Sequence, residues 1–254
     1  MATVITSPHN KHCINLNKLK TAQGRKHFGQ FLAEGKRLVD EAINAKVATQ
    51  IIFSSDYPYE KIYDNDIILP SNLFNKYAST ETPQGIMAIC DKLPQPDLKN
   101  FDNYKRIIIC SVIQDPGNLG NIIRTANALG VDCVVLSKGC VDLYNDKVIR
   151  STMGAIFNVP ILTDIYLLDF VDFLHEKGIR TIGLSLDGDN IYELPKADKN
   201  ALIVGNEALG IDIRLQEKLS TLAKIPMFAG ESLNAATSVA VAGYELTRKR
   251  LYDI

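Results

Sequence analysis

Three loops of the sequence gather residue types that could bind a small ligand or take part in catalysis. Each follows an apolar segment typical of a strand: loop 114–120 follows 106–113, loop 206–210 follows 201–205, and loop 228–234 follows 223–227. All three are rich in Gly, Asn, Ser or acidic residues. In open parallel sheets, ligands bind beyond the carboxyl ends of the strands. We therefore expect the three loops to meet at one edge of a sheet.

These loops do not have the pattern of a phosphate-binding loop. The chain contains no G-x-x-x-x-G-K-[ST] motif, and no G-x-G-x-x-G follows the strand at 106–113. In the segment Gly205-x-Glu207-x-x-Gly210, a carboxylate stands where a nucleotide-binding loop presents bare backbone. A pyrophosphate is therefore a poor match for the site, and a ligand with a ribose or a cationic centre fits it better.

Arg124 stands out within the helix that follows the first of these loops. At helical spacing, Ile122, Ile123, Ala126 and Leu129 form one apolar stripe, and Arg124 points almost to the opposite side. No acidic residue lies three or four positions away from it. Two interpretations stay open on this evidence: an exposed arginine without a role, or a guanidinium that binds a phosphate or polarises a hydroxyl.

Ser232 precedes the long final helix, and the sequence predicts that it is the N-cap of that helix. A nucleophilic role is not expected, because the chain has no G-x-S-x-G elbow. The only histidine of the C-terminal half, His175, lies on the polar side of an amphipathic segment.

The elements that would position these loops alternate regularly after residue 105. Strands are expected at 106–113, 132–137, 181–186, 201–205 and 223–227, and helices around 120–129, 167–178 and 234–250. Strands that are apolar on both faces and alternate with helices indicate a parallel sheet covered on both sides. The C-terminal part is therefore expected to be an α/β domain.

The first hundred residues have a different, mixed pattern. Strand-like segments and one helical segment alternate irregularly, the strands at 27–35, 50–55, 66–70 and 85–91 and the helix at 36–43. The segment 93–103 contains two prolines and few apolar residues, which is typical of a linker. We expect an N-terminal domain at 1–95, a linker at 96–104 and a second domain at 105–254.

The composition is that of an ordinary soluble globular protein, with 254 residues, 46% apolar and 22% charged, and a net charge of −1. No apolar run is long enough to span a membrane, and the N-terminus lacks a signal-peptide core. Five scattered cysteines without a C-x-x-C pair argue against a disulfide framework or a zinc site, and they fit a reducing cytoplasm.

Charge is unevenly distributed along the chain. Residues 1–37 hold seven Lys or Arg and one acid, whereas residues 38–104 hold ten acids and five Lys or Arg. The basic segment is either a local phosphate-binding patch or an ordinary solvated surface.

Taken together, the motifs resemble the SpoU (TrmH-type) family of SPOUT RNA ribose methyltransferases. Residues 118–124 match the first motif, N-x-G-x-x-x-R, residues 202–210 match the second, and residues 225–227 with 232–234 match the third. The stretches ITSPHNKHCINLNKL and FLAEGKRLVDEA look like the family's RNA substrate-binding domain, and RSTMGAIFNVP (150–160) is also similar to a family segment. The resemblance covers nearly the whole chain.

The resemblance implies a fold, a cofactor and a partner. The C-terminal domain would be a SPOUT-type α/β domain, with a mostly parallel sheet and a trefoil knot. The N-terminal domain would be a small α/β RNA-binding domain. The knot loops would bind S-adenosyl-L-methionine in a bent shape, in a pocket lined by Gly205, Ile225, Leu233, Leu184 and Met227. The family works as a homodimer, so Arg124 would act at a site that the partner subunit completes.

The implied reaction is methyl transfer to a ribose 2′-hydroxyl of RNA without a metal ion. Arg124 would orient the hydroxyl and stabilise its developing negative charge, or act as the base. Asn118, Ser232 and Asn234 would fix the hydroxyl or the adjacent phosphate, and Glu207 would hold its loop or position the nucleotide. The RNA is expected to be ribosomal, with transfer RNA left open, and its contacts in the basic segment would be Lys11, Arg25, Lys36 and Arg37.

Two departures from the family pattern affect the third motif. Ala236 stands where a serine is frequent, and the loop between Met227 and Ser232 is one residue shorter than in many relatives. They bear on the positioning of the substrate rather than on the reaction class.

Two other functions stay open: a non-catalytic RNA-binding or ribosome-assembly factor, which needs no cofactor pocket, and a methyltransferase that acts on a base or a protein.

Overall fold

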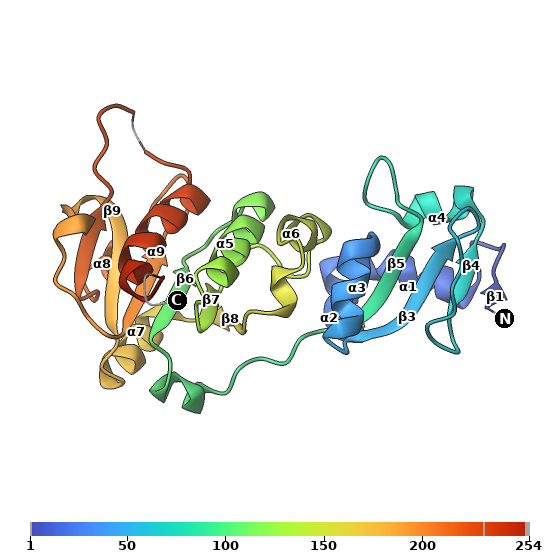
Figure 1. Cartoon of the computed structure of the whole chain (residues 1–254), viewed down its shortest axis with the longest axis horizontal. Coiled ribbons are helices and arrows are strands. Elements are labelled where there is room, and N and C mark those ends of the chain that lie inside the picture. The colour runs from blue at the N-terminus through green and yellow to red at the C-terminus, as the bar shows by residue number, and fades with distance from the viewer. Residues whose placement is uncertain (1, 231, 252–254) are drawn as a thin grey trace. The chain divides into compact units, whose positions relative to one another are not determined.

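The structure, a computed structural model, describes residues 2–230 and 232–251, and Figure 1 shows its helices and strands. The chain folds into two units. Unit 1 comprises Met1–Pro94 and Tyr144–Phe157, and unit 2 comprises Gln95–Leu143 and Asn158–Ile254. The segment Tyr144–Phe157 therefore packs with unit 1, although the sequence analysis placed it in the C-terminal domain.

Unit 1 is built on a five-stranded sheet in the order β1-β4-β3-β5-β2. Its strands are β1 (Thr3–Val4), β2 (Gln30–Glu34), β3 (Ala48–Ser54), β4 (Ile67–Leu69) and β5 (Ile86–Asp91). β1, β4 and β3 are parallel, whereas β5 is antiparallel to both β3 and β2. Its helices are α1 (Lys11–Leu19), α2 (Ala22–Phe28), α3 (Lys36–Asn44), α4 (Ser71–Tyr77) and α6 (Asp146–Ser151). This is the small α/β fold expected near the N-terminus.

The strand expected at 27–35 is shorter in the structure, because α2 occupies its first residues. α2 ends at Phe28, and Gly29 follows in the left-handed conformation (φ 64°), which glycine adopts without steric cost. β2 then begins at Gln30. α1, α2, α4 and α6 have nine residues or fewer, too few turns for a helical period to be recognised in the sequence.

Unit 2 contains a six-stranded sheet in the order β11-β9-β10-β6-β7-β8. Its strands are β6 (Arg106–Cys110), β7 (Cys133–Ser137), β8 (Ile161–Ile165), β9 (Arg180–Asn190), β10 (Asn200–Val204) and β11 (Thr221–Lys224). Every pairing recorded between these strands is parallel. The expected mostly parallel sheet is confirmed, with β8 as an addition that the sequence analysis missed. The trefoil knot stays a prediction.

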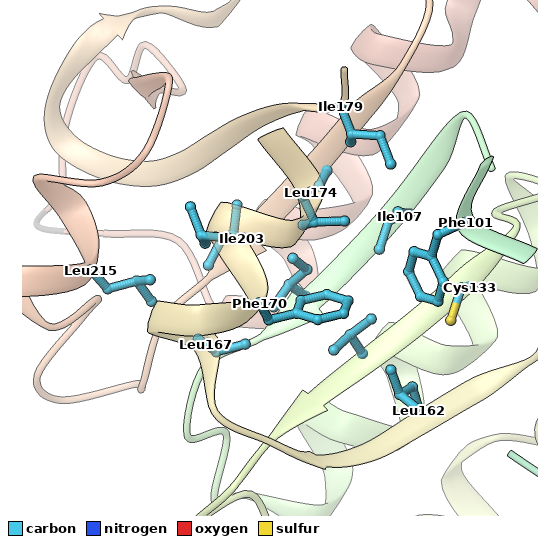
Figure 2. Close-up of a cluster of buried hydrophobic side chains, with 14 of the residues drawn as sticks. Phe101, Ile107, Cys133, Leu162, Leu167, Phe170, Leu174, Ile179, Ile203 and Leu215 are labelled. Atoms are coloured by element: carbon cyan, nitrogen blue, oxygen red, sulfur yellow. The ribbon is translucent and has the colours of Figure 1, made fainter. Parts of the chain in front are cut away.

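Helices cover both faces of the unit 2 sheet. They are α5 (Pro116–Ala128), α7 (Leu167–Glu176), α8 (Ile213–Gln216) and α9 (Ala235–Leu251). On one face, Phe170 and Leu174 of α7 pack against Ile203 of β10, as Figure 2 shows. Because neighbouring residues of a strand point to opposite faces, Leu202 faces the other side, where it packs with Ala242 of α9. All five residues of β10 are buried, which explains the apolar run from Ala201 to Val204.

The segment expected as a linker contributes to the core of unit 2. Leu98–Asp102 form a short 3₁₀ helix, and Phe101 is fully buried in edge-to-face contact with Phe170, at 5.5 Å between ring centroids. A single aromatic residue among prolines and polar residues thus anchors the beginning of unit 2. Within the described part of the chain, no helix has the length and apolar character needed to cross a membrane.

Candidate functional site

A cavity of about 500 Å³ lies at the carboxyl edge of the unit 2 sheet. Its wall is formed by four segments, 184–187, 204–211, 223–227 and 232–238, each of which contributes several residues, together with Gln216 of α8. They come from β9, from the loop after β10, from β11 with its following loop, and from the beginning of α9. The volume falls within the range of pockets that hold nucleoside-sized ligands.

Residues 184–187 reach the cavity because β9 bulges away from β11. Gly183 is in register with Leu222 and Asp189 with Ala223, so five residues of β9 stand opposite a single step of β11. A Cβ on Gly188 would lie 2.4 Å from the backbone nitrogen of Ala223. Glycine at this position allows the close backbone approach that closes the bulge.

Close backbone approach also explains Gly205, at the end of β10. A Cβ on this residue would lie 2.2 Å from the carbonyl carbon of Gly210. The loop folds back in this way because Asn206 and Gly210 exchange two backbone hydrogen bonds, both 2.9 Å long. Asn206 Nδ2 also donates to the carbonyl of Val112 (2.9 Å), which ties this loop to the one after β6. The glycines of the second motif thus shape a tight loop against the cavity.

A chain of hydrogen bonds joins the three motifs beside the cavity. Asn118 Nδ2 donates to Glu207 Oε1 (2.9 Å), and Asn234 Nδ2 donates to Asn118 Oδ1 (2.8 Å). Asn234 Oδ1 in turn accepts from the backbone N–H groups of Ala236 (2.9 Å) and Thr237 (3.3 Å). Each asparagine accepts through its oxygen and donates through its nitrogen, so the contacts fix the direction of the whole chain.

The N-cap of α9 is Asn234, and the prediction that Ser232 has this role is wrong. α9 begins at Ala235, and the Asn234 side chain satisfies two N–H groups of its first turn. Ser232 lies two residues earlier, on the cavity wall, where its side chain is exposed. Asn234 therefore both caps α9 and takes part in the hydrogen-bonded chain of the site.

Glu207 is the charged member of the hydrogen-bonded chain. Burial alone would raise the pKa of its carboxyl, but hydrogen bonds from Asn118 and from the backbone N–H groups of Asp115 (3.3 Å) and Gln114 (3.5 Å) outweigh burial and lower it. The carboxylate is therefore ionised at neutral pH and is an acceptor only. It orients Asn118 and the loop after β6, and it is a poor candidate for a proton donor.

The structure brings most of the residues singled out in the sequence to this cavity. The wall includes eight of them: Leu184, Gly205, Glu207, Ile225, Met227, Ser232, Leu233 and Asn234. Asn118 is hydrogen-bonded to two of these, Glu207 and Asn234.

Arg124 does not join the cavity of its own chain. It lies on the exposed side of α5, opposite the buried Ile122, Ile123 and Ala126. Among the residues that the structure describes, none forms a hydrogen bond or ion pair with its guanidinium.

Three of the four basic residues singled out in the N-terminal segment are exposed on unit 1, and one is not. Lys11, Lys36 and Arg37 are exposed, with Lys36 paired to Asp40 at 2.7 Å. Arg25 is only 5% exposed, and its Nη1 donates to the carbonyls of Leu19 (3.1 Å) and Lys20 (3.0 Å).

The contacts of Arg25 correct its predicted role. The last carbonyls of a helix have no partner within it, and the Arg25 guanidinium satisfies two at the end of α1. A buried side chain that is committed in this way is not available to a phosphate at the surface. Arg25 is therefore removed from the candidate RNA contacts.

Among the site residues that the sequence analysis did not single out, Asn206 and Asp187 have polar side chains that bear on the site. Asn206 holds the two loops together, and the signal for it was an asparagine directly after a buried strand, a position that favours local side-chain hydrogen bonds. Asp187 lies on the cavity wall, and the only signal was the pair Gly183 and Gly188 within a strand. In the described part of the chain, no group of three or more His, Cys, Asp or Glu residues could hold a metal ion.

Comparison with known proteins identifies the family. Residues 105–244 match the SpoU rRNA Methylase family, and residues 10–88 match the MRM3-like substrate binding domain. The chain belongs to the SpoU rRNA methylase family. It is 35% identical over 248 residues to the 23S rRNA (guanosine(2553)-2′-O)-methyltransferase RlmP of Bacillus subtilis, covering 95% of this chain and 98% of that protein. The expected family and the expected class of RNA methyltransferase are thereby confirmed.

Solved structures share the fold over nearly the whole chain. A TrmH-family protein from Porphyromonas gingivalis superposes with a TM-score of 0.82 and 27% identity, covering 94% of this chain and 98% of that one. The SpoU methyltransferase AviRb from Streptomyces viridochromogenes, in complex with AdoMet, superposes with a TM-score of 0.85 at 23% identity, covering 96% and 99%. The SpoU-family fold is therefore common to both units.

Proposed function

We propose that this SpoU-family enzyme transfers a methyl group from S-adenosylmethionine to a ribose 2′-hydroxyl of ribosomal RNA. The observation that carries the proposal is a nucleoside-sized cavity whose wall includes Glu207 and Asn234, both bonded to Asn118. RlmP, which is similar over nearly the whole chain, is by its name a 2′-O-methyltransferase of 23S rRNA. That name favours ribosomal over transfer RNA as the substrate.

The residues of the cavity fit the methyl donor. A side chain at Gly205 would collide with the loop that forms one wall, and Leu184, Ile225, Met227 and Leu233 add apolar surface for an adenosyl group. When bound, S-adenosylmethionine supplies an electrophilic methyl group on a sulfonium sulfur. The similar fold of AviRb holds AdoMet, which supports the same cofactor here.

Asn118, Asn234 and Ser232 are proposed to hold the acceptor. Each asparagine uses one N–H of its side-chain amide in the hydrogen-bonded chain, and a second N–H is left to bind a hydroxyl or phosphate oxygen. Ser232 adds a hydroxyl at the cavity wall. A site that holds both reactants in attack geometry lowers the barrier by about 7–11 kcal/mol.

Arg124 is proposed to act in the active site of a second copy within a homodimer. Its guanidinium is exposed and has no partner among the described residues, and the described wall of the cavity contains no Lys or Arg. A guanidinium that reaches the acceptor oxygen from the partner subunit would orient the hydroxyl and stabilise its developing negative charge. This arrangement gives a reason for an arginine that points away from its own core.

The first test replaces the arginine. Arg124→Ala is expected to lower the rate of methyl transfer by about 100-fold or more, since it removes one charged donor to the developing oxyanion. Calorimetry should show unchanged affinity for S-adenosylmethionine. Arg214→Ala is the matched control, because Arg214 is exposed and pairs only locally with Asp212 (3.1 Å). If Arg124→Ala methylates RNA at the wild-type rate, the assigned role is wrong.

A mixing experiment tests whether the arginine acts across subunits. Arg124→Ala is mixed with Gly205→Val, a variant whose cavity loop is obstructed. Random exchange of subunits should restore about a quarter of the active sites if each site takes its arginine from the partner. No recovery, with subunit exchange verified by mass spectrometry, would contradict the proposed dimeric site.

A map of methylated positions tests the reaction itself. Total RNA from cells with and without the protein is compared for 2′-O-methyl groups, and we expect one ribosomal position to depend on the protein. A methylated base, or a methylated transfer RNA, would correct the substrate. No difference, together with no heat of binding for S-adenosylmethionine, would favour a non-catalytic RNA-binding factor.

The compartment is also part of the proposal. The five cysteines have free thiols, and four of them are buried in the structure: Cys13, Cys90, Cys110 and Cys133. Free thiols are typical of a reducing compartment, and we propose the cytoplasm.

A further inference from the structure

The cavity of unit 2 has a one-sided charge. Among the described residues of its wall, the only ionisable groups are two carboxylates, Asp187 and Glu207, and there is no Lys, Arg or His. Beside these two side chains, a cationic group of a ligand is attracted and an anionic group is repelled, because charges interact strongly in a site that is partly shielded from water.

The two carboxylates differ in how far they are engaged by the protein. Glu207 accepts hydrogen bonds from Asn118 and from the loop after β6, so its charge is partly compensated. Asp187 lies on the bulge of β9, and its backbone N–H donates to Ser185 Oγ (3.4 Å). Its carboxylate forms no hydrogen bond or ion pair with any residue that the structure describes. Asp187 is therefore free to act on a ligand.

We infer that Asp187 makes the cavity selective for a ligand that carries positive charge at its reacting atom. The inference rests on the proposed function, in which this cavity holds the methyl donor, and it adds a specificity-determining residue to it. The bulge between Gly183 and Gly188 brings the carboxylate to the wall. A regular β9, paired with β11 throughout, would leave these residues in the ladder.

The reaction changes the charge that Asp187 senses. Methyl transfer forms a bond between the ribose oxygen and the methyl carbon and breaks the bond between that carbon and sulfur. The electron pair of the broken bond stays on sulfur, and the proton of the hydroxyl leaves to solvent. The sulfonium thereby becomes a neutral thioether. The attraction to Asp187 is present before the transfer and absent after it, which favours binding of the donor and release of the product.

Calorimetry on the full-length protein tests this selectivity with three ligands. They are S-adenosylmethionine, its thioether product S-adenosylhomocysteine, and sinefungin, in which an ammonium group replaces the methylated sulfonium. Asp187→Asn is expected to weaken both cationic ligands about three- to tenfold, as loss of one partly screened charge at short range implies. The affinity for the thioether should change less than about twofold. Asp189→Asn is the matched control, because Asp189 is an exposed aspartate of the same strand that does not line the cavity.

Each outcome bears on the inference separately from the proposed function. If Asp187→Asn weakens all three ligands equally, or none of them, the charge selectivity is refuted, while the methyl-donor site still stands. If the wild-type protein binds none of the three, the proposed function itself fails. The donor-specific effect of Asp187 should also shrink as salt rises from low to about physiological ionic strength, since exposed charges are screened. A salt-independent effect would count against an electrostatic cause.

Discussion

Replacing Glu207 by Gln removes one of the two accepting oxygens at the end of the hydrogen-bonded chain of the site. The carboxylate accepts from Asn118 Nδ2 (2.9 Å) and from the backbone N–H groups of Asp115 (3.3 Å) and Gln114 (3.5 Å). A glutamine of the same shape has one accepting oxygen, and its other terminal group is a donor. Either the asparagine or the backbone then faces an N–H group instead of an oxygen.

The size of the effect follows from these contacts. Hydrogen bonds to a charged group contribute about 1.5–3 kcal/mol and neutral ones about 0.5–1.5 kcal/mol. The substitution weakens one good bond, and it replaces one of two long bonds by a donor–donor contact. Because the group is at the surface of the loop, we expect a loss of about 1–2 kcal/mol in the free energy of unfolding. For a chain of this size, this corresponds to a decrease in Tm of about 3–6 °C.

The loss should depend on pH in one direction. The folded-state pKa of Glu207 is lower than that of an unfolded glutamate, about 4.3. The stabilisation by the carboxylate is therefore fully present above that value and is lost as pH falls through the lower, folded-state pKa. The difference between wild type and Glu207→Gln should be largest near neutral pH and should shrink in acid.

Urea unfolding at neutral pH and again below about pH 4 measures this difference. Glu217→Gln is the control, because Glu217 is exposed and its side chain has no recorded partner in the described structure. The reasoning is refuted if Glu207→Gln is as stable as wild type at neutral pH. It is also refuted if the loss persists unchanged in acid, since the hydrogen bonds would then not depend on the charge.

Two further predictions concern the strained turn after β6 and the basic surface of unit 1. Val112→Gly should raise the free energy of unfolding by about 1 kcal/mol, because Val112 has φ 57° and glycine adopts this conformation without strain. Its backbone bonds to Ser137 Oγ and Asn206 Nδ2 would remain, so a lower urea midpoint would contradict the argument. Joint charge reversal of Lys36 and Arg37 should weaken RNA binding and flatten its salt dependence. An unchanged salt slope would count against RNA contact at these residues.

The sequence was sufficient to place the first two loops at one site because the strands before them, β6 and β10, are largely continuous apolar runs. β6 and β10 are buried on both faces, and such strands pair in parallel with their carboxyl ends together. Gly205 and Glu207 could therefore be assigned to a common edge with the loop after β6, whereas Asn234 could be assigned to it only by its place in the third motif. The loop residues that were placed by the order of the three motifs and by the type of the preceding strand lie where they were predicted.

What the sequence could not supply depends on local backbone geometry. An arginine in a basic segment is expected to be a surface residue. Only the fold shows that Arg25 donates hydrogen bonds to carbonyls at the C-terminal end of α1. Ser232 and Asn234 are both good capping residues, and the choice between them depends on where the chain turns into α9. The position of Asp187 on the cavity wall depends on the bulge of β9. This change of register cannot be recognised from the spacing of apolar residues.

The charges of the cavity give a reason for a site shared between two subunits. A sulfonium donor is held best where no cation lies beside it, and the described cavity wall carries only Asp187 and Glu207 as charged groups. The acceptor oxygen has the opposite need, because its negative charge grows during transfer and requires a cation. A guanidinium on the wall itself would stabilise the negative charge on the acceptor oxygen, but it would repel the sulfonium of the donor. In the proposed dimer, the partner's Arg124 meets the acceptor oxygen, while the donor keeps a wall without cations.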